Sequence, residues 1–145
     1  MKKTHPDVIR QLNEALRIQL TCINQCFLHA RILKHGGLMQ LADGEFKESL
    51  DSMKFADQLV ERILLLGGMP HMQPLGEIKV GQAQADMLEC DLQLKQEVKR
   101  QVEMAIAVCK EHGDQQSVDL LDNILKQADE HISYINDKQG ALDAA

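Results

Sequence analysis

Aromatic residues are scarce in this chain of 145 residues, which has no tryptophan, one tyrosine and three phenylalanines. Because strands favour aromatic side chains, this shortage argues against a β-sandwich. The chain also lacks an apolar run of the roughly 18–20 residues that cross a bilayer, and residues 1–6 lack the apolar core of a signal peptide. We therefore expect a cytoplasmic protein with no membrane partner.

Positive charge is in short supply as well. The chain has 16 Lys and Arg against 22 Asp and Glu, with a formal net charge of -6, which is the wrong sign for a nucleic-acid partner. Without a secretion signal, the four cysteines are expected to be reduced thiols. The length suits one domain, and we expect residues 1–145 to form it.

Glycine and proline divide the chain into four segments with few helix breakers. These segments predict helices over about residues 7–35, 38–66, 82–112 and 114–137, with Asp43 as an alternative start of the second. Thr4 and Asp7 have the spacing of a capping box. Short turns make each pair of helices an antiparallel hairpin, whereas the link over residues 67–81 is long enough to cross the whole bundle. We expect an all-α, ferritin-like antiparallel four-helix bundle.

Heptad-type spacing predicts which residues face the core. The inward stripes are apolar except near the middle, where four polar residues interrupt them: Gln19, Ser52, Lys95 and His131. The second helix carries an additional apolar stripe, formed by Phe46, Leu50, Met53, Val60 and Leu64. One bundle cannot bury both faces of a helix, so this stripe indicates an oligomer contact.

Three motifs stand out on the first two helices. Residues 23–31 read I-N-Q-C-F-L-H-A-R, residues 48–54 read E-S-L-D-S-M-K, and residues 56–64 read A-D-Q-L-V-E-R-I-L. These motifs resemble those of bacterioferritin, and the resemblance extends over essentially the whole chain. It implies a subunit of a hollow twenty-four-subunit cage that stores iron as a mineral. It further implies a dimeric building block that carries one b-type haem per subunit pair at the two-fold contact.

The resemblance also locates the ferroxidase centre, which needs a Glu from each of two helices and a Glu-x-x-His motif from each of the other two. The corresponding positions here are Gln19, Ser52, Phe55, Lys95, Ala128 and His131. His131 alone keeps a metal-binding side chain, and Lys95 adds a positive charge where two cations would lie. We therefore expect a degenerate centre without intrinsic ferroxidase activity. Cys26 stands where the family has a tyrosine beside this site.

Two interpretations of the substituted positions remain open. The polar residues can form a hydrogen-bonded cluster in the core, or His131 and Cys26 can form a new metal site. Burial would favour the neutral form of Lys95, unless its stem carries the ammonium to an opening of the bundle. A weaker metal candidate joins Cys22, Cys26 and His29 along the first helix.

Helical periodicity alone predicts that Met53 only packs in the hydrophobic core. The resemblance instead implies that it is an axial ligand of haem iron, with one methionine from each subunit of a symmetric pair. The residues that match or resemble the lining of the family's haem pocket are Leu20, Ile23, Asn24, Phe27, Phe46, Leu50, Lys54 and Asp57.

The acidic start of the second helix and the C-terminal tail lead to two further predictions. Glu45, Glu48 and Asp51 lie near the start of the second helix, where a solvated acidic face is expected because carboxylates offset the helix dipole. The resemblance offers iron nucleation on the inner cage surface as the alternative. Residues 137–145 contain Gly140 and are expected not to form a packed helix, so the family's fifth helix would be missing, leaving wide four-fold openings or weaker assembly.

Together these features predict a haem-binding, bacterioferritin-type subunit of an iron-storage cage without its own ferroxidase centre. It would aid assembly and electron transfer for iron mobilisation, as a homo- or hetero-oligomer with a ferroxidase-competent bacterioferritin subunit and a ferredoxin-type reductant. The alternative is a non-storage haem protein, a dimer or a cage, for electron transfer or haem buffering. A di-iron oxidase with relocated ligands is a third interpretation.

Overall fold

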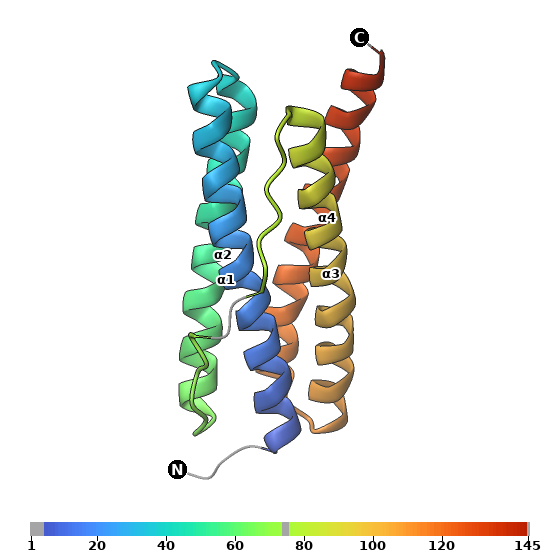
Figure 1. Ribbon diagram of the computed structural model, residues 1–145. Helices are drawn as coiled ribbons and strands as arrows, with labels where there is room; N and C mark the ends of the chain where they lie inside the picture. Colours follow the sequence, from blue (N-terminus) through green and yellow to red (C-terminus); the bar gives the residue numbers. More distant parts are fainter. Residues whose placement is uncertain (1–4, 74–75, 145) are drawn as a thin grey trace.

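Four long helices make up the computed structural model, which describes residues 5–73 and 76–144. They are α1 (Pro6–His35), α2 (Met39–Leu65), α3 (Gln84–Glu111) and α4 (Gln115–Ala144), and the described residues contain no strand. Figure 1 shows α1 and α2 as one hairpin beside a second hairpin of α3 and α4. The predicted ferritin-like four-helix bundle is confirmed.

Tight turns close both hairpins. Gly37 follows α1 with a φ of 83°, and Gly113 follows α3 with a φ of 70°. Backbone with positive φ favours glycine because a Cβ would clash there. Each turn leaves its two helices antiparallel and in contact.

The long link between α2 and α3 runs along α1 and crosses the bundle from end to end (Figure 1). Four buried side chains of α1 accept hydrogen bonds from its backbone N–H groups, namely Asn13 from His71, Thr21 from Gly76, Gln25 from Lys79 and His29 from Gly81. Such bonds satisfy backbone groups that would otherwise be buried without partners. At the last of them the link is packed so closely that a Cβ on Gly81 would collide with the backbone nitrogen of Met87.

Around this frame the core follows the predicted stripes. α1 packs against α2 and α3, and α4 packs against the same two helices, so α2 and α3 lie diagonally opposite. Fully buried residues from all four helices fill the interior, including Leu12, Leu16, Leu59, Val98, Leu121 and Ile124. The middle of each helix is thereby fixed against the core, which positions the polar residues there.

The end of the fourth helix differs from expectation. α4 continues without a break to Ala144, so the predicted end at residue 137 was wrong. Residues 136–144 bury no side chain, which agrees with the expectation that this tail does not form a packed helix. Gly140 is exposed with open space around it, and a glycine inside a helix costs only about 1 kcal/mol. The start of α1 also differs, because the ring of His5 caps the helix by accepting from the Asp7 N–H. The predicted cap, Thr4, lies outside the described residues.

Candidate functional site

The positions that the resemblance assigns to the ferroxidase ligands lie in the core of the bundle. Gln19, Ser52, Lys95, Ala128 and His131 are all buried, and Phe55 is half-buried. They come from all four helices, as a site in the bundle core requires. Among the described residues, Gln19 Oε1, Ser52 Oγ and His131 Nδ1 find no hydrogen-bond partner. The four polar residues are therefore buried as expected, but the described residues contain no hydrogen bond that joins one of them to another.

Lys95 is the dominant residue of this cluster. It is 1% exposed, and its Nζ lies 3.4 Å from Glu48 Oε2 and donates to Gln127 Oε1 at 3.3 Å. Burial alone would lower the pKa of Lys95, but the neighbouring Cys22, Glu48 and Cys26 outweigh burial and raise the pKa. We expected either a neutral Lys95 or an ammonium that reaches an opening of the bundle. Both expectations were wrong, because they did not consider Glu48 as a partner.

Glu48 is drawn into the core rather than solvated. It is 8% exposed, and it also accepts a hydrogen bond from Gln127. His131 Nδ1 lies 3.4 Å from the same carboxylate. Burial and the positive charge of Lys95 lower the pKa of His131 to about 3, so its imidazole is neutral. The centre of the bundle thus holds one ammonium and one carboxylate that balance each other.

A second buried polar cluster lies beside the first. Asp91 Oδ1 accepts from Gln25 Nε2 at 2.9 Å and lies 3.1 Å from His29 Nδ1, and Glu45 Oε1 lies 3.8 Å from the same ring nitrogen. Glu45 is 5% exposed, so the expectation of a solvated Glu45 was also wrong. Helix spacing could have predicted that the carboxyl groups of Asp91 and Glu45 are buried. Asp91 falls three residues after Leu88, and Glu45 falls seven before Ser52, on the buried stripes.

His29 has two competing demands on its protonation. Burial lowers its pKa, but the hydrogen bond to Asp91 and the nearby carboxyl group of Glu45 outweigh burial and raise the pKa to about 9, which favours the charged ring. The Gly81 N–H, however, donates to Nε2 at 3.1 Å and needs a lone pair there. The neutral ring with its proton on Nδ1 satisfies both Asp91 and Gly81, and we assign that tautomer.

The cysteine-based metal candidates are placed differently from expectation. Cys22 packs in the apolar core cluster, so it does not join Cys26 and His29 as a ligand. Cys26 is grouped with Glu45 and Asp91, whose possible ligand atoms all lie within 4.8 Å of one another. His131 is not in that group, and the pairing of Cys26 with His131 finds no support in the described residues.

The residues expected to line a haem pocket lie along α1 and α2. Met53 is 53% exposed, and it is flanked on α2 by Phe46 and Leu50, at 43% and 42%. Phe27 of α1 joins them, with its ring 6.4 Å from that of Phe46. Asn24, Lys54 and Asp57 are exposed, while Leu20 and Ile23 are half-buried against the core. The two helices thus present an exposed apolar surface, which we call the Met53 face.

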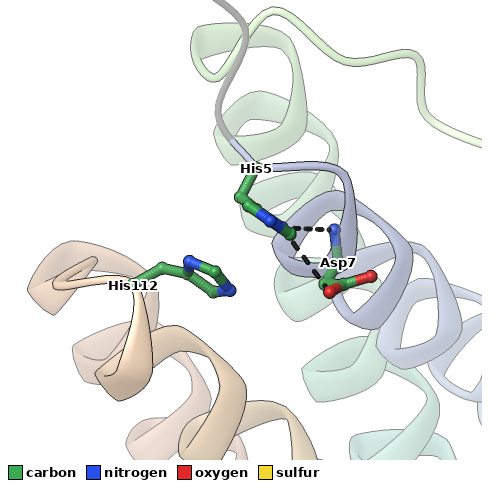
Figure 2. Close-up of side chains that lie close together, drawn as sticks. All are labelled: His5, Asp7 and His112. Carbon is green, nitrogen blue, oxygen red and sulfur yellow. Dashed lines mark hydrogen bonds and ion pairs between the residues drawn. The ribbon is translucent and has the colours of Figure 1, made fainter.

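Figure 2 shows a third group, His5, Asp7 and His112, at the end of the bundle. The two imidazole rings are stacked with centroids 3.9 Å apart. His5 Nδ1 already accepts from the Asp7 N–H. This group is explained as a helix cap with a stacked neighbour.

Comparisons with known proteins agree with this architecture. A family model described as "Ferritin-like domain" matches residues 9–144. The bacterioferritin of Mycobacterium leprae (strain TN) is 41% identical over 130 residues, which cover 90% of this chain and 82% of that relative. "Bacterioferritin BfrA" of Mycobacterium tuberculosis (strain H37Rv) is 38% identical over 138 residues, covering 95% and 87%. The bacterioferritin of Brucella melitensis is 34% identical over 133 residues, covering 92% and 83%.

The chain belongs to the bacterioferritin family of iron-storage, ferritin-like proteins. Membership agrees with the bundle and with the long link between its two hairpins. Within residues 5–73 and 76–144, no helix has the length and apolar character needed to cross a membrane.

Glu48→Gln tests the pair at the centre of this bacterioferritin bundle. The change leaves the ammonium of Lys95 buried without a counter-charge, so we expect it to cost about 3–5 kcal/mol of unfolding free energy. Asp51→Asn is the matched control, because Asp51 pairs with the exposed Lys47, and such surface pairs contribute about 1 kcal/mol or less. Denaturant unfolding measures both.

The double variant Glu48→Gln with Lys95→Met removes both charges and should recover much of the lost stability. Equal unfolding free energies for Glu48→Gln and Asp51→Asn would show that the buried pair is not what holds this region.

Proposed function

We propose that this bacterioferritin family member is a haem-binding subunit of an iron-storage cage that has no ferroxidase centre of its own. The observation that carries this proposal is the Lys95–Glu48 pair at the centre of the bundle. In this account the subunit contributes assembly and electron transfer for iron mobilisation, and a second kind of subunit oxidises the iron.

Charge is the main argument against a di-iron centre in this chain. Two ferrous ions bring four positive charges into the core, and hard cations of this kind are held by carboxylates. Glu48 supplies one negative charge, which Lys95 already balances. The expected ligand positions Gln19, Ser52 and Ala128 supply none. Ferrous ions would therefore meet an ammonium instead of a ligand set, and a ferroxidase-competent bacterioferritin subunit is the partner that this deficit requires.

The Met53 face supports the haem assignment. An exposed apolar surface that spans two helices of a small chain is typical of an interface. In a two-fold contact one residue near the axis faces its own copy, so two Met53 thioethers can lie on opposite sides of one bound group. Thioether sulfur suits haem iron. Haem bound there would supply one-electron transfer, and a ferredoxin-type reductant is the proposed electron donor.

A native mass spectrum with iron and haem analysis tests the function as a whole. The proposal expects an oligomer built from dimers, with one haem per subunit pair, that carries iron when it is co-expressed with a ferroxidase-competent subunit. A haem-loaded dimer or cage that never takes up iron under those conditions would instead support the non-storage haem protein.

Leu50→Asp tests whether the Met53 face is the dimer contact. We expect monomers, because the variant buries an unpaired carboxylate in an apolar interface. Met104→Asp is the control, since Met104 is 59% exposed on α3, diagonally across the bundle from α2. Native mass spectrometry should show dimers for Met104→Asp. Dimers of Leu50→Asp would place the contact elsewhere.

Met53→Leu tests the haem ligand itself. The substitution keeps volume and apolarity, and such swaps usually cost less than about 1.5 kcal/mol, so the dimer should survive while both sulfur ligands are lost. We expect the low-spin haem spectrum to disappear, and Met104→Leu to leave it unchanged. An unaltered spectrum at one haem per pair in Met53→Leu would exclude Met53 as the ligand.

A further inference from the structure

The buried cluster formed by Cys26, Glu45 and Asp91 has no role in the function proposed above. These residues come from α1, α2 and α3, and their exposed fractions are 1%, 5% and 1%. One possible ligand atom from each lies within 4.8 Å of the other two. Three different helices thus bring a sulfur and two carboxylates to one point in the core.

Two oxygens in this cluster lack partners. Glu45 Oε2 and Asp91 Oδ2 are buried and accept no hydrogen bond from any described residue. Leaving a buried polar atom unpaired costs about 1–3 kcal/mol, and more for a charged group. Such atoms call for an explanation. Burial and the neighbouring Asp91 raise the pKa of Glu45 to about 8, so the two carboxyl groups can share a proton, and a cation that displaces this proton would occupy the same place.

The other oxygen of each carboxylate faces groups that orient it. Gln25 donates to Asp91 Oδ1, His29 lies beside both Asp91 Oδ1 and Glu45 Oε1, and the link between α2 and α3 holds Gln25 and His29 in place. Supporting hydrogen bonds of this kind fix the ligands of metal sites. His29 belongs to this supporting layer, because its Nε2 is occupied by the Gly81 N–H.

We propose that Cys26, Glu45 and Asp91 form a buried mononuclear site for a divalent transition metal of the zinc class. The ligands are the Cys26 thiolate and the unpartnered oxygens of Glu45 and Asp91. Zinc accepts sulfur and carboxylate oxygen together and is usually four-coordinate. Calcium and magnesium prefer oxygen alone, so the cysteine selects against them. The site is distinct from the substituted ferroxidase positions and does not depend on the proposed haem function.

The charges of the three side chains suit such an ion. Two carboxylates and one thiolate bring three negative charges, of which a divalent cation would neutralise two. Burial and the carboxyl groups of Asp91 and Glu45 raise the pKa of the Cys26 thiol, so the thiolate forms only together with the bound cation. Binding requires the thiol to release its proton to solvent, as metal binding to cysteine generally does.

Cobalt titration of the metal-free, full-length protein tests the site, because Co²⁺ replaces Zn²⁺ and reports sulfur ligation optically. We expect one Co²⁺ per subunit, a thiolate-to-cobalt charge-transfer band, and displacement of the cobalt by Zn²⁺. Cys26→Ala should abolish the band and weaken Zn²⁺ binding by at least about 10–100-fold, the loss typical of a mutated supporting residue.

Cys22→Ala is the matched control. Cys22 is buried one turn earlier on the same helix but packs in the apolar core, so this variant should keep both the band and the affinity. Glu45→Gln, which preserves the side-chain shape, gives a second test should Cys26→Ala fail to fold, and it should weaken Zn²⁺ binding while the thiolate band persists at saturation. No charge-transfer band in the wild-type protein, or an unchanged band in Cys26→Ala, would overturn the proposal.

Discussion

A buried ammonium needs a carboxylate beside it, and this requirement organises the centre of the molecule. Lys95 is among the most deeply buried large side chains, and removing a charge of this kind from water costs several kcal/mol unless it is paired and hydrogen-bonded. Glu48 and Gln127 meet that need. Their arrangement leaves His131 neutral and leaves the charge of Glu48 compensated. One buried lysine therefore determines both the packing and the charge of the bundle centre.

The link between α2 and α3 connects this centre to the rest of the fold. Its backbone is hydrogen-bonded to a row of polar side chains on α1, and two of these, Gln25 and His29, also orient Asp91. The same contacts therefore hold the link against the bundle and fix the carboxylate of the second cluster. Because Gly81 is packed against the backbone of Met87, this end of the link has little freedom to move.

Much of the architecture could be predicted from the sequence, since the four helices are separated by glycine and proline and their inward stripes have regular spacing. The positions of Lys95 and His131 in the core followed from that spacing. Glu45 and Glu48 were misplaced because carboxylates near a helix start are usually solvated, whereas here each has a polar partner on another helix. The pairing of distant residues such as Gln25 with Asp91 depends on tertiary contacts that periodicity does not encode. The helical tail was missed because Gly140 was given more weight than the continuation of a long helix.

The most direct test of the central claim is stopped-flow oxidation of ferrous iron by the protein assembled from this chain alone. About two ferrous ions are added per subunit, because a di-iron site of the family binds two. The account predicts no fast phase, because the Lys95–Glu48 pair occupies the position where two cations would have to bind. It predicts the same for Ser52→Glu, since one added carboxylate does not remove the ammonium. A fast phase that saturates at two ferrous ions per subunit in the unmodified protein would contradict the account.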